Sequence, residues 1–254
     1  MRKLLLVPLI IFTTLISCQS NDDSIPPTLE EETEIKYPEG TVFCNDVITE
    51  IKDVTNPVTG KTWMDRNLGA SQVATSIDDA AAYGDLYQWG RGADGHQCRD
   101  SQNTSTFSNS DQPSHGDFIL ASTSESVDWR SPQNDNLWQG VDGVNNPCPN
   151  GYRLPTEAEL IAERESWTSK DPAGAFASPL KFSLPGVRTF YLSESIMHVG
   201  TEGYYWSSSF RKGTGAGTGY NINSSYSSVL SIDSPRGHGV TYRASGHTVR
   251  CIKN

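Results

Sequence analysis

The chain has 254 residues, 30 of them acidic and 20 basic, which gives a formal net charge of −10. This balance argues against nucleic acid as a partner. Only 35% of the residues are hydrophobic, while 22 glycines and 14 prolines are spread along the chain. This composition favours short strands and long ordered loops over a helical bundle.

Residues 1–17 resemble a lipoprotein signal peptide. Arg2 and Lys3 precede an apolar run over residues 4–16, which is too short to span a bilayer. Residues 15–18 read Leu-Ile-Ser-Cys and resemble a lipobox, with Cys18 as the acylated first residue of the mature protein. The alternative is an ordinary secretory signal with a chance cysteine. We therefore expect an outer membrane lipoprotein of a Gram-negative bacterium, held to the membrane only by its lipid anchor.

Residues 18–40 are acidic, contain proline and lack large apolar clusters, as a flexible tether does. Asp22 and Asp23 resemble the acidic export signals of surface lipoproteins, although a solvated linker would look the same. Residues 41–254 are then long enough for one domain with a sizeable core. Without Arg2 and Lys3 the balance becomes 30 acidic against 18 basic residues, or −12.

Four cysteines remain in the expected domain, namely Cys44, Cys98, Cys148 and Cys251. An even number in an oxidising compartment, without a Cys-x-x-Cys pair, predicts two disulfides. Four cysteines allow three pairings, and the spacing does not choose among them.

Two helices are predicted from capping patterns. In TSIDDAAAYGD, Ser76 is the expected cap, three alanines follow Asp79, and Gly84 ends the helix. In LPTEAELIAERESW, Thr156 and Glu159 form a capping box before a run with helical spacing. The remaining segments favour strands and loops, so we expect an α+β fold of short twisted antiparallel strands.

Five segments in order, GKTWMDRNLGA, AYGDLYQWGR, CPNGYRLPTEAEL, GYYWSSS and VRCIKN, resemble the FISUMP domain of bacterial surface lipoproteins. That family is similar to the formylglycine-generating (sulfatase-modifying) enzymes and implies a C-type lectin-like fold. In such a fold the last strand pairs near the start of the domain. The resemblance therefore implies a Cys148–Cys251 disulfide, leaving Cys44 with Cys98, and gives Arg153 a structural role.

The sequence does not predict an enzyme. The sulfatase-modifying enzymes oxidise a substrate cysteine with two closely spaced cysteines near the C-terminus, which bind copper, whereas this chain has only Cys251 there. No His-Glu-x-x-His or His-x-His spacing is present, so no metal ligand or catalytic residue is assigned. Solvated loop positions are expected for the five histidines, which are His96, His115, His198, His238 and His247.

Calcium-dependent sugar binding in lectin-like folds usually uses a Glu-Pro-Asn or Gln-Pro-Asp loop and a following Trp-Asn-Asp. The segments DQPS and DNLW match these patterns only in part. No cofactor is therefore predicted. A structural calcium ion in the long middle loop remains open, because Asp and backbone carbonyl oxygens are abundant there.

Residues 211–247 are rich in Tyr, Ser, Gly and Asn, as antibody paratopes are. Polar loops without a ligand would have the same composition. Related lectin-like proteins bind ligands with this region, and in some it is diversified by retroelements. We expect an adhesin-like module that binds a protein or a glycan, with an enzyme or a structural envelope protein as alternatives. The expected ligand-binding residues are Tyr220, Asn221, Asn223, Tyr226, Arg236, His238, Tyr242 and Arg243.

Overall fold

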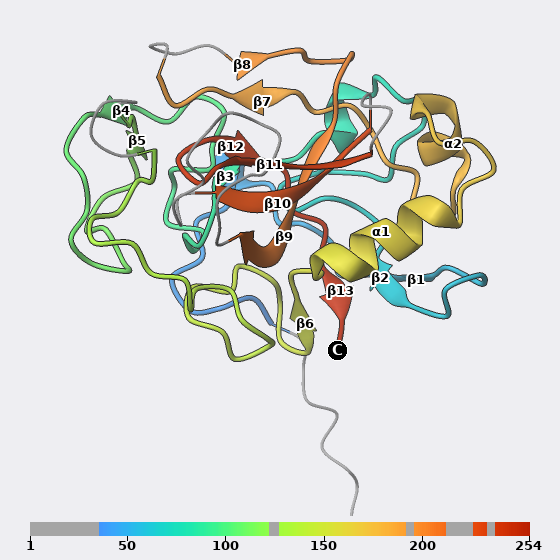
Figure 1. The fold of residues 1–254 in the computed structure, drawn as a ribbon, viewed down its shortest axis with the longest axis horizontal. Coiled ribbons are helices and arrows are strands. Elements are labelled where there is room, and N and C mark those ends of the chain that lie inside the picture. Colours follow the sequence, from blue (N-terminus) through green and yellow to red (C-terminus); the bar gives the residue numbers. More distant parts are fainter. Residues whose placement is uncertain (1–35, 122–126, 192–195, 212–225, 233–236) are drawn as a thin grey trace, which may run out of the picture. The chain divides into compact units, whose positions relative to one another are not determined.

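Small antiparallel sheets and two α-helices make up most of the regular structure (Figure 1). The computed structural model describes residues 36–121, 127–191, 196–211, 226–232 and 237–254. All of them belong to one compact unit that begins at residue 35. This arrangement agrees with the predicted α+β class. None of the helices formed by the described residues is long and apolar enough to cross a membrane.

The first sheet joins the start of the domain to its end. Its strand order is β1-β2-β13-β6, and Ile252 of β13 pairs with Trp63 of β2 on one side and Arg153 of β6 on the other. The last strand therefore pairs near the start of the domain, as expected. The strands are β1 (Asp53–Thr55), β2 (Thr62–Met64), β6 (Tyr152–Arg153) and β13 (Ile252–Lys253).

Two further sheets lie in the other half of the fold. One has the order β11-β10-β9 and the other β3-β12-β7-β8, while a parallel pair joins β4 to β5. In Figure 1, β7 and β8 border the region that contains β10, β11 and β12. The strands are β3 (Tyr87–Gln88), β4 (Asn103–Thr104), β5 (Phe118–Ile119), β7 (Val187–Arg188), β8 (Ile196–Met197), β9 (Tyr204–Arg211), β10 (Tyr226–Ser231), β11 (His238–Tyr242) and β12 (Gly246–His247).

Helix α1 (Glu157–Glu165) confirms the predicted capping box. The Thr156 hydroxyl accepts a hydrogen bond from the backbone N–H of Glu159, and the Glu159 carboxylate accepts one from the backbone N–H of Thr156. The same carboxylate binds the Arg153 guanidinium at 2.8 Å. Arg153 therefore ties the strand before the helix to its first turn, which is the structural role expected for it.

The first predicted helix is wrong in type and extent. Only the 3₁₀ turn η2 (Ala80–Ala82) forms, and Asp79 rather than Ser76 caps it by accepting a hydrogen bond from the backbone N–H of Ala81. The run is too short to repay helix nucleation without an apolar face. The second α-helix is instead α2 (Pro172–Ala177), which Asp171 caps and Pro172 begins. One further 3₁₀ turn, η1 (Cys44–Asp46), lies near the start of the described chain.

The core is built around tryptophan. All six tryptophans of the chain are buried, including Trp63 and Trp89, which are fully inaccessible. Several indole N–H groups bind backbone carbonyls of distant segments: Trp89 donates to Ser207 O and Trp129 donates to Trp89 O. Trp129 and Trp138 both come from the long middle loop, which is the segment 120–151 between β5 and β6. The Trp129 bond therefore fastens this loop to the segment after β3.

Two disulfides close the fold. Cys44 is bonded to Cys98 and Cys148 to Cys251, so the pairing implied by the FISUMP resemblance is present in the structure. The second bridge links the turn before β6 to the segment before β13. The folded part also begins earlier than residue 41, because the Tyr37 hydroxyl donates to Thr49 O and its ring packs on the core.

Candidate functional site

A groove of about 470 Å³ runs between β11 and the hairpin formed by β7 and β8. One wall contains all of β11 together with Val229 and Ser231 of β10. The opposite wall contains Val187, residues 189–191 and Met197. The groove therefore lies where two sheets diverge, and it brings together segments about 50 residues apart in the chain.

Aromatic side chains dominate the rim. The rings of Tyr226 and Tyr242 lie 4.7 Å apart, and Phe190 lies 4.8 Å from Tyr242 and 4.9 Å from Tyr191. Tyr191 is 57% exposed, which is high for a large aromatic side chain. Such rings offer a large contact area at low cost in side-chain entropy.

A short polar chain crosses one end of the groove. His198 Nδ1 lies 3.1 Å from Glu202 Oε1, and the Tyr204 hydroxyl donates to Glu202 Oε2 at 2.7 Å. The Glu202 carboxylate thus has a partner on each oxygen. His198 adopts a left-handed backbone conformation (φ 61°) and its carbonyl accepts hydrogen bonds from Thr201. A residue held in this region marks a locally strained turn.

His247 forms part of the groove floor. Its ring is packed 4.6 Å from Trp206 and 5.2 Å from Tyr204, and Nε2 lies 3.3 Å from the Thr241 hydroxyl. Burial lowers the pKa of His247 to about 3. It is therefore a neutral, largely apolar ring at neutral pH. The expectation that it is a solvated loop histidine was wrong.

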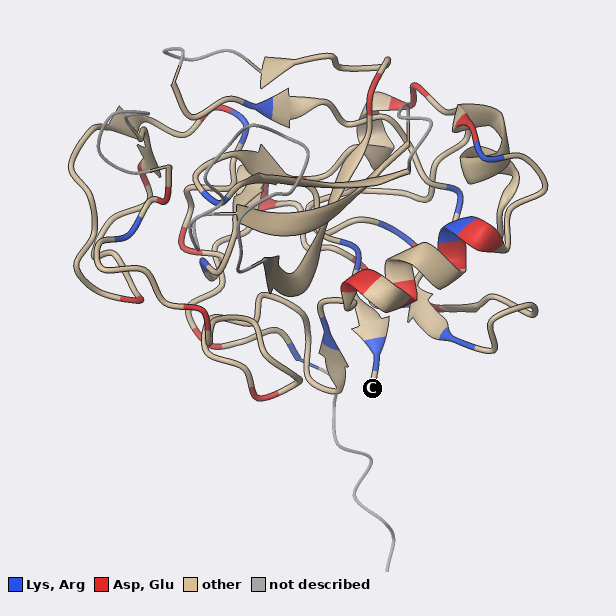
Figure 2. Cartoon of the chain, in the orientation of Figure 1, with Lys and Arg blue, Asp and Glu red and all other residues tan. Residues whose placement is uncertain are grey.

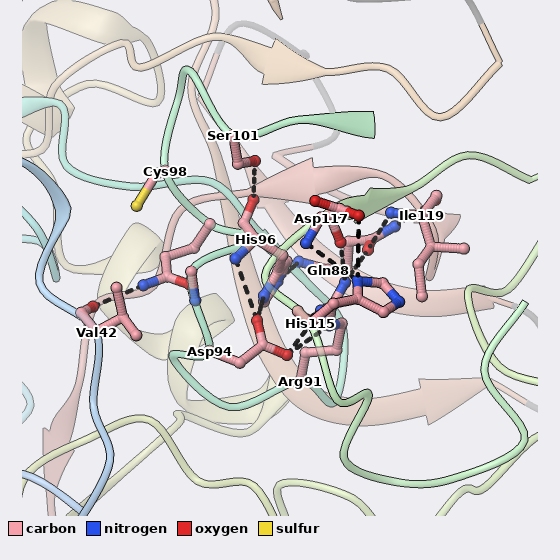
Figure 3. A network of polar contacts seen from close by, with 12 residues as sticks. Val42, Gln88, Arg91, Asp94, His96, Cys98, Ser101, His115, Asp117 and Ile119 are labelled. Atoms are coloured by element: carbon pink, nitrogen blue, oxygen red, sulfur yellow. Dashed lines mark hydrogen bonds and ion pairs between the residues drawn. The ribbon is translucent and has the colours of Figure 1, made fainter. Parts of the chain in front are cut away.

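A second polar cluster surrounds His96, which is also fully buried rather than solvated (Figure 3). His96 Nδ1 lies 2.6 Å from Asp94 Oδ1, and its Nε2 accepts a hydrogen bond from the backbone N–H of Gln88. Burial, together with the charge of Arg91, lowers the pKa of His96 to about 4. With both ring nitrogens engaged inside the protein, this His–Asp pair has a structural use.

The same cluster ties three loops to β3. Arg91 binds Asp94 Oδ2 at 2.6 Å and the side-chain oxygen of Gln88 at 2.9 Å (Figure 3). Gln88 in turn exchanges hydrogen bonds with the backbone of Ile119. Although burial alone would raise it, the pKa of Asp94 is held at about 2 by His96 and Arg91. The cluster thus acts as an internal framework beneath the sheets.

The structure places the predicted binding residues in three groups. Tyr226 and Tyr242 lie side by side across β10 and β11, and His238 and Tyr242, at the two ends of β11, both line the groove. The prediction is wrong for Arg243, whose side chain is fully buried and therefore faces no ligand. Tyr220, Asn221, Asn223 and Arg236 lie outside the described residues, as does the lipidation candidate Cys18.

Arg243 is buried because it serves the long middle loop. Its guanidinium binds Asp135 Oδ1 at 2.7 Å and lies 3.7 Å from Asp128, while it stacks 4.1 Å above the Trp89 ring. These partners come from segments more than 100 residues earlier in the chain. The local sequence around Arg243 gives no sign of them.

Sequence reasoning missed the opposite wall of the groove. Phe190, Tyr191 and Met197 follow no capping or metal-binding pattern, and His198 and Glu202 are separated by four residues outside any helix. No local signal would have found them, because only the pairing of β7 with β12 brings them beside β11. Among the described residues, no group of three or more His, Cys, Asp or Glu side chains is placed to hold a metal ion.

Comparisons with protein-family models, with curated proteins and with solved structures found no match to this chain.

Proposed function

We propose that this chain is a lipid-anchored ligand-binding module of the bacterial cell envelope, with a C-type lectin-like domain of the FISUMP type. Recognition takes place in the groove between β11 and the β7–β8 hairpin. The observation that carries this proposal is a groove of about 470 Å³ with aromatic rings at its rim, of which Tyr191 is exposed, and into which β11 brings His238 and Tyr242. A concave site with aromatic walls and a few polar groups is typical of ligand binding.

The alternative of a sulfatase-modifying oxidase is disfavoured by the disulfides. Cys251 is bonded to Cys148 and is fully buried, so its sulfur has a structural partner. The buried His96–Asp94 pair likewise has its ring nitrogens engaged by the protein itself. Both observations support a binding module rather than that chemistry. A protein or a glycan ligand fits the proposal, and nucleic acid does not suit the net charge of −10.

The groove is tested by probing an array of glycans and proteins with the labelled full-length chain. A Tyr191→Ser, His238→Ala double variant should lose at least about 30-fold in affinity for the bound probe, because a single hot-spot side chain already contributes about 2 kcal/mol. Both side chains are exposed, so the melting temperature should change little.

The matched control is Val58→Ser, which alters an exposed side chain that does not line the groove. It should bind the probe as the unchanged protein does. Equal binding by the double variant and the control, with both folded, would contradict the groove as the recognition site.

The lipid anchor has a separate test, motivated by the Leu-Ile-Ser-Cys sequence at residues 15–18. Cys18→Ser should abolish metabolic labelling with palmitate and release the protein from the membrane fraction, since acylation requires the thiol. Ser20→Ala is a control that retains the lipobox, Cys18 and both disulfides of the domain. Palmitate labelling that survives Cys18→Ser would refute the proposed anchor.

A further inference from the structure

The outer edge of β11 has no neighbouring strand among the described residues. The sheet order is β11-β10-β9, so β10 covers one edge of β11, while the groove takes in the whole of β11 and extends over the sheet to Val229 and Ser231 of β10. The strand is five residues long and pairs with β10 in regular register, from Tyr226 opposite Tyr242 to Leu230 opposite His238.

The register shows which backbone groups face outward. The Ser231 N–H donates to Gly237 O at 3.0 Å, so these two facing residues form a hydrogen-bonded pair. In an antiparallel ladder such pairs alternate with pairs that share no hydrogen bond, and His238 and Val240 belong to pairs of the second kind. The N–H and C=O groups of His238 and Val240 therefore point away from β10. No described residue binds these groups, whereas Tyr242 O accepts a hydrogen bond from the backbone N–H of Ser245, which closes the strand's end.

The long strand at the opposite edge of this sheet is covered. Thr248 pairs with β9 through a bridge to Tyr205, and Ser208 donates its backbone N–H to Pro155 O. β9 is therefore protected along the part of its edge that these contacts occupy.

Other sheet edges in the described part of the chain are short or charged. β1 has three residues and contains Asp53, which binds Lys253. β8, β3 and β6 have two residues each. In contrast, β11 contains no Lys, Arg, Asp, Glu or Pro, and Figure 2 shows it without charged positions. Proteins usually blunt exposed strand edges with such residues, so β11 lacks the common protection against pairing.

The side chains beside this edge are chiefly apolar and aromatic. Tyr191 and Met197 are the exposed apolar and aromatic side chains of the lining and Val240 of β11 lies with them, whereas Phe190 is itself buried and polar side chains such as Thr241 and His238 complete the lining. Among the described residues that line the groove the one carboxylate is Glu202, which already has His198 and Tyr204 as partners. An occupant needs no strong charge to match this lining.

We propose that β11 binds an extended, largely apolar segment of a partner polypeptide as an additional antiparallel or parallel strand. The segment's backbone pairs with His238 and Val240, and alternate side chains enter the aromatic groove. Main-chain hydrogen bonds supply affinity and the groove supplies selectivity, as in other cases of strand addition. This inference rests on the proposed function, and it assigns a ligand class to the same site.

The test uses random peptides displayed on phage and selected on the full-length chain, followed by synthesis of a recovered peptide. Val240→Pro removes one outward N–H without removing a hydrogen bond to β10, a position where an edge strand tolerates proline. Val240→Ala measures how much the Val240 side chain contributes to the affinity for the peptide. The affinity of Val240→Pro should fall at least about tenfold below that of Val240→Ala, because only the former loses the backbone donor.

A second readout does not depend on a protein variant. Methylation of single backbone nitrogens in the recovered peptide should weaken binding at every second position, which is the period of a paired strand. Loss of binding without this alternation, equal affinity of the two Val240 variants, or failure to recover any peptide would overturn strand addition.

The two proposals can fail separately. If the Tyr191→Ser, His238→Ala double variant no longer binds a ligand, whereas Val240→Pro binds it with unchanged affinity, the groove remains the binding site and strand pairing is refuted. If none of these substitutions changes the affinity for the ligand, both proposals are refuted.

Discussion

Arg243 illustrates how a buried charge holds a long loop against a sheet. Its guanidinium binds Asp135 at 2.7 Å, donates a hydrogen bond to the Ser227 hydroxyl at 3.2 Å and lies above the Trp89 ring. Burial raises the pKa of the nearby Asp128 to about 7, although Arg243 opposes this effect. The protonation state of Asp128 in the middle loop therefore depends on the charge of Arg243, which directly follows β11.

We predict that Arg243→Met lowers the free energy of unfolding by about 3 to 5 kcal/mol, because it leaves buried carboxyl groups without their partner. Chemical denaturation measures this change. Lys253→Met is the matched control: its ion pair with Asp53 is 44% and 40% exposed, so its loss should cost less than about 1 kcal/mol. An equal loss of unfolding free energy in the two variants would show that the buried contacts of Arg243 do not stabilise the fold.

At the scale of elements, local chemistry predicts a segment well when its partners are close in sequence. The Thr156–Glu159 capping box is confirmed because its bonds span three residues. The same reasoning overestimated the segment at Ala80–Ala82, where good helix formers lack an apolar stripe to bury. Asp171 and Pro172 form an ordinary helix start that sequence reasoning overlooked.

The strands, in contrast, depend on partners that are distant in sequence. β7 and β8 are two residues each, too short to have a recognisable alternating pattern. β7 is positioned by pairing with β12, nearly 60 residues further along the chain, and β8 by pairing with β7. The groove between these strands and β11 could therefore not be predicted, although composition had led us to propose His238 and Tyr242, which line it, as binding residues.

At the scale of the whole molecule, buried ionisable groups determine how stability varies with pH. Burial lowers the pKa of His247 to about 3 and that of His96 to about 4, compared with 6.5 in the unfolded chain. As pH falls below about 6.5 the unfolded chain takes up protons that these folded histidines do not, so both destabilise the fold. Asp85 and Asp128 act in the opposite direction between about pH 7 and 4, because burial raises the pKa of each to about 7.

Since these contributions oppose one another, the prediction concerns a single group. Between pH 7 and pH 5 the contribution of His247 should cost about 2 kcal/mol of folding free energy. His247→Phe keeps an aromatic ring beside Trp206 and should remove that cost, which urea denaturation at the two pH values measures. Val58→Ser, at an exposed position whose side chain does not titrate, is the control and should retain the original pH dependence. An unchanged pH dependence in His247→Phe would contradict the assignment.

The sequence by itself determined the features that depend on neighbours along the chain, namely the capping of α1 and an even set of cysteines suited to two bridges, and its resemblance to the FISUMP domain added the structural use of Arg153. Only the tertiary structure decided that His96 and His247 are buried, and that Arg243 faces the core while Tyr191 faces the groove. The physical reason is that the cost of burying a polar or charged side chain depends on the partners that meet it. In this fold those partners come from loops and strands remote in sequence, which the pairing of short strands brings together.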